Sequence, residues 1–435
     1  MTRPIPRPDG KTALAALRSL VRNRNLLYAL DVFHAALGDV FELTLPGQRA
    51  IVLVGPEASR LVLITGRDKF LWRMADDPVV TLFGGGLLVV DGEEHARLRN
   101  MMNPALHRRA LAGYVADMVR LTDATMADWT PDAPLIMLDE MRKITLKILT
   151  ETLFAVDVTP DLARLWQPVL KAIQFISPGY WLLSGRLPRP GYTRQIGVLN
   201  AYLDAIIARR RSELPTDADD LLSVLIASGM DDRLIRDQLI TLLIAGHDTT
   251  TALLAWALHL LTAHPAVLAR VQSEVETVLG GSPPTLESAA RLPYLSQVID
   301  ETLRLYPPVH LGSRLVAEDV PFQDYVLPAG ARVMYSIYLT HRHPDYWEEP
   351  ERFNPDRFDR ANKRAIPPYA FLPFGGGPRN CIGAAFGQLE AKVILARVVQ
   401  RFDLRASGVP IRMSVKATLE PHPGVPVFVH PRAGS

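Results

Sequence analysis

The spacing of apolar positions predicts helices over most of the chain. From about Leu111 to Ser228 apolar residues recur with the period of an amphipathic helix, with breaks at Pro160, Pro178 and 188–190. After Gly383 the pattern is helical again, in the run AAFGQLEAKVILARVVQRF. Helices therefore dominate the predicted fold.

Strand patterns are short and lie towards the two ends of the chain. Between Tyr28 and Ile64 we expect a helix, two strands joined at Pro46–Gly47 in a hairpin turn, and the start of another helix. Further extended runs are expected at 315–337, 413–419 and 425–429. The predicted fold class is mainly α with small β-sheets.

One long apolar segment stands out from the other predicted helices. Asp231 or Asp232 can cap a helix that runs to about Ala263, where a His-Pro pair stops it. Thirty residues would span about 45 Å, and the stretch 239–261 is apolar enough to cross a membrane. Asp248 lies in its middle, where a charge would be costly in a bilayer. We therefore predict a buried central helix with a polar notch.

The amino-acid composition excludes some classes of protein but does not indicate a function. Hydrophobic residues make up 48% of the 435 residues and charged residues 22%, which is typical of a globular chain with ample core. A net charge of +2 gives no reason to expect a nucleic-acid partner. The first residues contain no apolar run typical of a signal peptide or transmembrane anchor. We expect a single domain over 1–435, with 1–27 as an N-terminal segment without a fold of its own.

Cys381 is the only cysteine, which excludes disulfides, four-thiolate zinc sites and iron–sulfur clusters. A buried spectator, a nucleophile and a lone axial ligand to a metal or haem remain. The preceding glycines and Pro378 form a loop without bulky side chains, which can lie flat against a planar partner. Arg379 could neutralise an acid group on that partner, and the helix start after Gly383 favours a thiolate.

The notch in the central helix has a chemical logic of its own. The Thr249 hydroxyl can bond the carbonyl of Ala245 and loosen the helix, and Gly246 leaves space for a small ligand. Asp248 beside Thr249 pairs an acid with a hydroxyl, which suits proton delivery to bound oxygen. Taken alone, this pattern is a weak signal.

Two pairs of charged residues can each be interpreted either as part of a functional site or as ordinary surface groups. His95 and Arg99 lie on one face of a predicted helix and could grip one anion together, although a solvated charged helix explains them as well. Glu301 and Arg304 are spaced i, i+3 on a helix that ends at proline, and the plain interpretation is a surface salt bridge.

The decapeptide 374–383 resembles the haem-binding loop of the cytochrome P450 family, F-x-x-G-x-R-x-C-x-G. Its fixed positions fall on Phe374, Gly377, Arg379, Cys381 and Gly383. The resemblance implies the cytochrome P450 fold, with the long helix over the haem, and Cys381 as thiolate ligand of the iron of haem b. Such a ligand favours O–O cleavage.

Other segments resemble further motifs of the family. The run 245–250 resembles its oxygen-activation motif, which makes Thr249 the alcohol, Asp248 the acid and Ala245 and Gly246 their neighbours; His247 receives no role. By the same resemblance, haem propionates would be held by His95, Arg99 and Arg314. A structural ion network would join Glu301, Arg304 and Arg357, with Arg352 as the alternative to Arg357.

The resemblance also implies where substrate lies. The segment after Pro308 should pass the haem edge, so that Val309, His310, Leu311 and Gly312 face substrate; His310 could equally be a satisfied core histidine. Near the C-terminus a second wall is expected at 417–420, with Thr418 and Leu419. The segment 70–88 is expected to form a loop over the pocket.

The implied activity is that of a soluble, bacterial-type, cytoplasmic monooxygenase, which inserts one atom of O2 into a lipophilic small molecule by hydroxylation or epoxidation. Electrons would come from a ferredoxin with its reductase or from a flavodoxin-type donor, docked by Arg97, Arg108, Arg109 and Lys392. A peroxide-driven haem oxidase, a non-catalytic haem-thiolate sensor and a cysteine-nucleophile hydrolase remain as alternatives.

Overall fold

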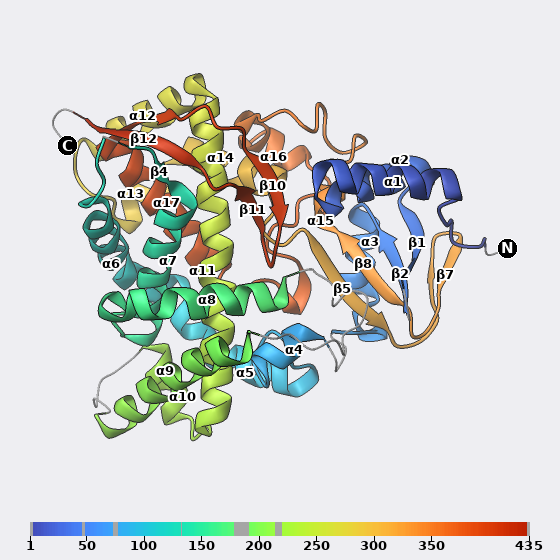
Figure 1. The fold of residues 1–435 in the computed structure, drawn as a ribbon, viewed down its shortest axis with the longest axis horizontal. Coiled ribbons are helices and arrows are strands. Elements are labelled where there is room, and N and C mark those ends of the chain that lie inside the picture. Colours follow the sequence, from blue (N-terminus) through green and yellow to red (C-terminus); the bar gives the residue numbers. More distant parts are fainter. Residues whose placement is uncertain are drawn as a thin grey trace.

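The computed structural model describes residues 3–45, 48–72, 77–131, 133–177, 191–213 and 220–432. Helices form most of the molecule, as predicted (Figure 1). The expected hairpin turn at 46–47 and the breaks at Pro178 and 188–190 lie outside the described residues. The helices are α1 Gly10–Asn23, α2 Leu26–Leu37, α3 Pro56–Arg60, α4 Pro78–Phe83, α5 Gly92–Leu106, α6 Arg108–Met126, α7 Met137–Phe154, α8 Leu162–Ile176, α9 Thr193–Ser212, α10 Leu221–Ala227, α11 Asp232–Ala263, α12 Pro265–Leu279, α13 Leu286–Ala290, α14 Pro293–Leu305, α15 Ile337–Thr340, α16 Asn362–Ala365 and α17 Ala384–Arg401.

Helix α11 is the predicted central helix, and it runs vertically through the helical part of the molecule in Figure 1. The Asp231 side chain caps it by accepting the Leu234 N–H at 2.9 Å, and the helix ends at Ala263 as expected. Its length and composition would suffice for a membrane span, but 83% of its most apolar window is buried inside the protein. Burial by other helices identifies it as a core helix.

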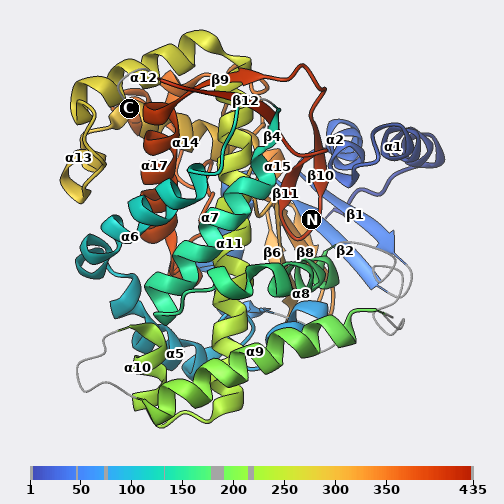
Figure 2. The same cartoon turned by 60° about the vertical axis from the view of Figure 1, so that its left-hand side comes forward.

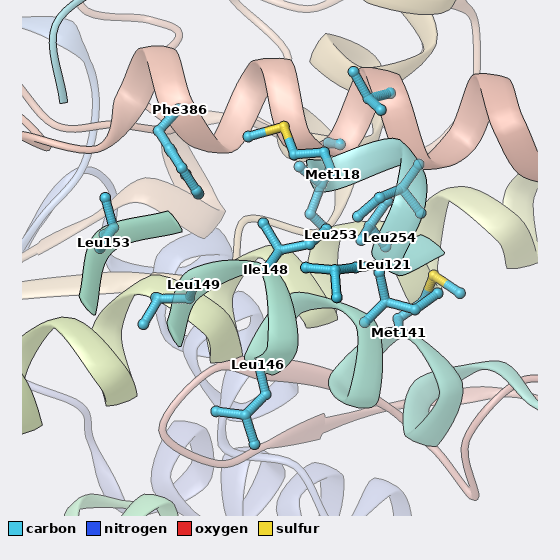
Figure 3. Packing of buried hydrophobic residues seen from close by; sticks show 14 of the residues in the cluster. Met118, Leu121, Met141, Leu146, Ile148, Leu149, Leu153, Leu253, Leu254 and Phe386 are labelled. Carbon is cyan, nitrogen blue, oxygen red and sulfur yellow. The ribbon is translucent and has the colours of Figure 1, made fainter. Parts of the chain in front are cut away.

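The main hydrophobic core surrounds this helix. Figure 3 shows side chains from α6, α7, α11 and α17 packed together, among them Met118, Ile148, Leu254 and Phe386. Helix α11 packs most extensively against α7, and also against α14 and α17. The core thereby fixes α11 beside the start of α17, the helix that follows Cys381.

The strands form small sheets, most of them on one side of the helical part (Figure 1). The largest sheet has the order β1-β2-β8-β5-β3, in which β2 and β8 are parallel and the other neighbours antiparallel. β12 pairs with β4 and β9, β10 with β11, and β6 with β7. The strands are β1 Val40–Leu45, β2 Gln48–Leu53, β3 Phe70–Leu71, β4 Leu135–Ile136, β5 Leu311–Val316, β6 Val320–Phe322, β7 Tyr325–Leu327, β8 Arg332–Ser336, β9 Phe402–Ala406, β10 Arg412–Val415, β11 Leu419–His422 and β12 Pro426–Pro431.

The segment 1–27 contains helix α1, which packs against α2 and buries Ala16 (Figure 2). One expectation about the fold needs correction. Strands are not restricted to the two ends, since β4 lies in the first half of the chain and pairs with β12. A two-residue strand is too short to show a period in sequence, and its partner supplies the reason that it is extended.

Candidate functional site

The loop before α17 is held in a shape that needs glycine. The Cys381 N–H donates to the Phe374 carbonyl at 2.9 Å, which closes the loop. Gly375 and Gly377 have φ values of 69° and 65°, in the left-handed region. A Cβ on Gly377 would lie 2.5 Å from the Leu63 carbonyl oxygen, so a side chain there would displace backbone. The loop sequence therefore fixes where the Cys381 sulfur is presented.

Cys381 is exposed although many protein atoms lie around its sulfur. Burial among these protein atoms raises the pKa of its thiol. The backbone N–H of Gly383 and the Arg99 guanidinium act in the opposite direction and lower the pKa. Arg99 is held beside the thiol by bonds to the Asn380 carbonyl, 2.8 Å, and the Asn380 side chain, 2.7 Å.

Basic side chains gather near the cysteine. Burial, together with the positive charges of Arg379 and Arg99, lowers the pKa of His95 to about 4, so this histidine is neutral at pH 7. Arg379 donates to the Asp91 carboxylate and to the Val90 carbonyl. The cluster thus carries more positive than negative charge beside the exposed cysteine, which favours an anionic group there.

Trp72 extends this cluster and was missed by sequence reasoning. The Arg314 and Arg379 guanidinium carbons lie 3.4 and 4.3 Å from the centroid of its ring. Pairing of β3 with β5 places Leu71 opposite Leu315, which brings the next residue, Trp72, towards Arg314. The segment 70–88 was expected to form a loop; it contains β3 and α4, and residues 73–76 lie outside the described residues.

Helix α11 presents a narrow open stripe. Within 241–258, all of it described, Ala245, Gly246 and Thr249 are partly exposed while every other residue is buried. The Thr249 hydroxyl donates to the Ala245 carbonyl at 2.9 Å, as the helical spacing predicted. Gly246 also has a role that the sequence did not indicate. A Cβ there would lie 2.4 Å from Leu149 Cδ1, so the glycine lets α7 approach closely.

Asp248 does not share this stripe. Its side chain is 2% exposed and accepts the Thr418 hydroxyl at 2.9 Å, while Arg142 Nη2 lies 3.3 Å from its Oδ1. Arg142 also donates to Glu420 at 2.6 Å. Among the described residues, the Asp248 side chain therefore does not face the same opening as the Thr249 hydroxyl, contrary to the expectation. Asp248 belongs instead to a buried ion network, which sequence reasoning missed because Arg142 lies 106 residues away.

Glu390 is a second acid near the stripe. It is 1% exposed, and burial raises its pKa to about 8, against a smaller effect of a hydrogen bond with Thr250. Thr250 also donates to the Gly246 carbonyl at 3.3 Å. The carboxyl on α17 and the hydroxyl on α11 thus meet directly below the notch. No sequence pattern pointed to Glu390, since its partner lies on another helix.

The raised pKa of Glu390 predicts a pH-dependent stability. The folded state keeps its proton up to about pH 8, whereas the unfolded state releases it near 4.5, so this group costs stability as pH rises through that window. Glu390→Gln is expected to gain about 1.4 kcal/mol relative to wild type for each pH unit between about 5 and 8. Urea unfolding at several pH values measures this difference.

The control for this prediction is Glu276→Gln, a change at an exposed position on α12. Its stability difference from wild type should stay constant over the same pH range. A constant difference for Glu390→Gln as well would contradict the assignment of a protonated carboxyl.

Glu301 and Arg304 form a fully buried pair rather than a surface salt bridge. Both side chains are 0% exposed, and two parallel bonds of 2.6 and 2.8 Å join them. Arg304 also donates to the carbonyls of His341 at 2.9 Å and Pro350 at 2.7 Å. His341 in turn accepts the Leu372 N–H at 2.8 Å, in the segment that leads to the cysteine loop. The pair therefore ties α14 to that loop.

The structure shows which of the two candidate arginines, Arg352 or Arg357, joins the ion network of Glu301 and Arg304. Arg357 Nε lies 3.4 Å from Glu301, and its side chain is 13% exposed. The Arg352 side chain is 65% exposed and pairs with Glu349; only its backbone carbonyl meets Arg304, at 3.2 Å. Arg357 is thus the third member of the buried ion cluster.

The residues expected to face substrate differ in their exposure. Val309 is 45% exposed and Leu311 is partly exposed. His310 is 7% exposed, and burial lowers its pKa to about 4, which describes a neutral core histidine. At Gly312 a Cβ would meet the Tyr335 ring at 2.0 Å. Val309 and Leu311 are the members of this segment that offer surface to a ligand.

The expected second wall offers less surface still. Thr418 is 4% exposed and bonded to Asp248, and Leu419 is 0% exposed. The Leu419 carbonyl accepts the indole N–H of Trp256 at 2.8 Å, and its own N–H donates to Pro308 at 3.0 Å. The expectation that these side chains contact substrate is not met in this structure, because both point into protein.

The site has the features of a haem-thiolate oxidoreductase. A lone, exposed thiol lies just before a helix start, beside a cluster of cationic side chains, and the neighbouring core helix has a partly exposed stripe. The chain belongs to the cytochrome P450 family, whose profile matches residues 6–425. Its cofactor is accordingly haem b, and the protein is an oxidoreductase.

Related proteins cover most of the chain. Cyclooctat-9-en-7-ol 5-monooxygenase of Streptomyces melanosporofaciens is 34% identical over 392 residues, 85% of this chain and 83% of the relative. Cyclooctatin synthase of the same organism is 32% identical and covers 85% of this chain and 84% of its own. Cytochrome P450 139 of Mycobacterium tuberculosis is 34% identical over 423 residues, 93% of this chain and 98% of the relative.

Proposed function

We propose that the protein is a monooxygenase that hydroxylates or epoxidises a lipophilic small molecule, with electrons from a separate ferredoxin or flavodoxin-type donor. The observation that carries the proposal is the open stripe of Ala245, Gly246 and Thr249 on an otherwise buried helix. A small ligand such as O2 needs such an opening in a core, and Thr249 is the residue there that can hold or pass a proton.

The residues of the cysteine loop suit a haem. Cys381 would ligate the iron, and Gly375 to Gly377 would let the loop lie against the ring. Arg99, Arg379 and Arg314, with neutral His95, would hold the propionates; the bonds of Arg379 to Asp91 would then be exchanged for a charge-assisted bond to the cofactor. Bound haem supplies the activation of O2.

The remaining polar groups hold and move protons. Thr249 donates to the Ala245 carbonyl in this structure and can turn its hydroxyl towards the opening. Asp248 is held away by Thr418 and Arg142, so a proton would reach Thr249 from it only after a rotation of the Asp248 side chain.

The substrate class follows from chemistry and from the relatives. Val309 and Leu311 offer apolar surface in the segment that is expected to face substrate. One relative is named for an unsaturated cyclic alcohol, cyclooctat-9-en-7-ol. We therefore propose a cyclic terpenoid-like alkene or alcohol as the substrate, taken up in the cytoplasm by one domain that comprises the whole chain.

The proposed docking site for the electron donor consists of exposed basic side chains. Arg97 is half exposed and pairs with Glu94, while burial lowers the pKa of Lys392, which makes Lys392 a poor contact for a partner. The side chains of Arg108 and Arg109 lie outside the described residues. Arg97 is therefore the proposed contact, and reversal of its charge should slow reduction by the donor.

The experiment uses the haem-loaded protein with a ferredoxin, its reductase and a panel of cyclic alkenes and alcohols. Binding should shift the spin state of the haem spectrum, and the product should gain one oxygen atom, labelled by ¹⁸O2. Product from hydrogen peroxide alone, with none from O2 and donor, would instead favour a peroxide-driven oxidase. Binding without turnover under either condition would favour a sensor.

Thr249→Ala tests the role of the stripe. The variant removes the hydroxyl but keeps the helix, so haem and substrate should bind as in wild type. Product formed per electron pair is expected to fall about a hundredfold or more, the lower end of the range in which a positioned proton donor contributes. Oxygen consumption and product are measured together. The control is Thr262→Ala, which removes a hydroxyl bonded to Leu258 near the helix end and should leave the yield unchanged.

A further inference from the structure

Two histidines and a carboxylate meet on the side of the molecule that carries the largest sheet. His34 lies on α2, Asp39 immediately precedes β1, and His343 follows α15. The Nε2 atoms of His34 and His343 lie 2.7 and 3.0 Å from the same oxygen, Asp39 Oδ1. The donor atoms of all three lie within 4.8 Å of one another. None of the three belongs to the haem site described above.

The spacing of these atoms is close to that of a zinc site. Ligand atoms about 2.0 Å from a tetrahedral Zn²⁺ lie about 3.3 Å apart. The present distances of 2.7 and 3.0 Å would have to widen by about 0.6 and 0.3 Å, and the two histidine nitrogens lie within 4.8 Å of each other. The side chains are 17%, 39% and 8% exposed for His34, Asp39 and His343, so the site opens to solvent at the carboxylate. Water can supply a fourth ligand there.

A second carboxylate, that of Asp345, lies next to His343. Asp345 Oδ2 lies 4.0 Å from His343 Nδ1, and the Asp345 N–H donates to the same nitrogen at 3.2 Å. When Nε2 binds a metal, Nδ1 carries the proton and needs an acceptor. In this structure that nitrogen accepts the Asp345 N–H, so metal binding through Nε2 would require this N–H to turn away and the Asp345 carboxylate to accept the Nδ1 proton. The result would be the arrangement of carboxylate, histidine and metal that recurs in zinc proteins.

The alternative is a metal-free clasp in which both histidines simply bond Asp39. Such a clasp needs a proton on each Nε2, and the bond from the Asp345 N–H to His343 Nδ1 is compatible with it. A carboxylate oxygen flanked by two imidazoles is also a ligand set that suits a divalent cation.

We propose that His34, Asp39 and His343 bind a divalent transition-metal ion, Zn²⁺ in the first place, with Asp345 as the acceptor for the His343 Nδ1 proton. The ion would join α2, the start of β1 and the segment after α15. His343 is two residues from His341, whose carbonyl accepts a bond from Arg304. Metal binding would therefore stiffen the sheet side of the protein next to the buried ion cluster.

The test is titration of the haem-loaded, chelator-treated protein with Zn²⁺ alone, in competition with a chromophoric chelator. One equivalent should bind, and the unfolding temperature should rise with Zn²⁺ concentration because the ion binds the folded state. His34→Gln and His343→Gln should each weaken binding at least a hundredfold. Asp345→Asn should weaken it 10- to 100-fold, as loss of an outer carboxylate does.

The matched control is His430→Gln, which removes an exposed histidine from β12. It should leave the affinity unchanged. Equal binding by wild type, His34→Gln and His343→Gln would overturn the proposal, as would absence of binding at about 1 mM Zn²⁺. If His343→Gln does not fold, partly exposed His34 still decides the matter. Equal affinity of Asp345→Asn would remove Asp345 from the site.

Discussion

Cys381→Ser is expected to abolish the red-shifted Soret band of the dithionite-reduced, CO-bound protein and to reduce turnover to background. Burial raises the pKa of the Cys381 thiol, with smaller opposing effects of the Gly383 N–H and Arg99, so the bound iron itself would hold the sulfur as a thiolate. A serine hydroxyl in the same place stays protonated and cannot donate electron density to iron in this way. The CO difference spectrum of wild type beside the variant measures the change.

Ile382→Val is the matched control, since it alters the next residue of the same loop and keeps the thiol. It should retain the band and the wild-type haem content. Persistence of the band in Cys381→Ser would show that another group ligates the iron, and the proposed reaction would then lose its basis. Thermal unfolding of both variants reports whether the loop change has disturbed the fold.

Arg304→Ala is expected to be the most destabilising single change away from the cysteine. Removing the guanidinium leaves the Glu301 carboxylate buried without its main partner, which costs about 3–5 kcal/mol. The carbonyls of His341 and Pro350 lose their donor as well. Denaturant unfolding should show this loss, or the variant should fail to retain haem because the support of the loop is gone.

Arg352→Ala provides the comparison, because the sequence alone could not separate Arg352 from Arg357. Its exposed side chain pairs only with Glu349, so its removal should change stability by no more than about 0.5 kcal/mol. Arg357→Ala should fall between the two, since it is mostly buried but more distant from Glu301. Similar losses for Arg352→Ala and Arg304→Ala would contradict this ranking.

Local patterns were enough to predict the main elements. The bounds of α11 and the start of α17 follow from capping residues, proline and the helical period, which act over a few positions. The same is true of the bond between Thr249 and Ala245 and of the glycine-rich loop before Cys381, since each involves residues within ten positions. These features are properties of short segments, so a single sequence carries them.

Tertiary structure decided which side chains meet across segments. The sequence predicted that Asp248 acts together with Thr249, but in the structure Asp248 contacts Arg142 and Thr418 in a buried network. Gly246 is part of the open stripe, as expected, but its missing Cβ also admits Leu149, which the sequence did not indicate. In each case the partner lies far along the chain and reaches the site only through helix packing, which no local period encodes.

The sequence by itself therefore determined the family, the cofactor, the helical frame and the position of the thiol. The tertiary structure decided the ion networks, the place of Trp72 between Arg314 and Arg379, and the meeting of His34 with His343. The physical reason is the range of the interactions involved. Backbone hydrogen bonds and caps join near neighbours, whereas the partner of a buried charge is set by the packing of the whole core.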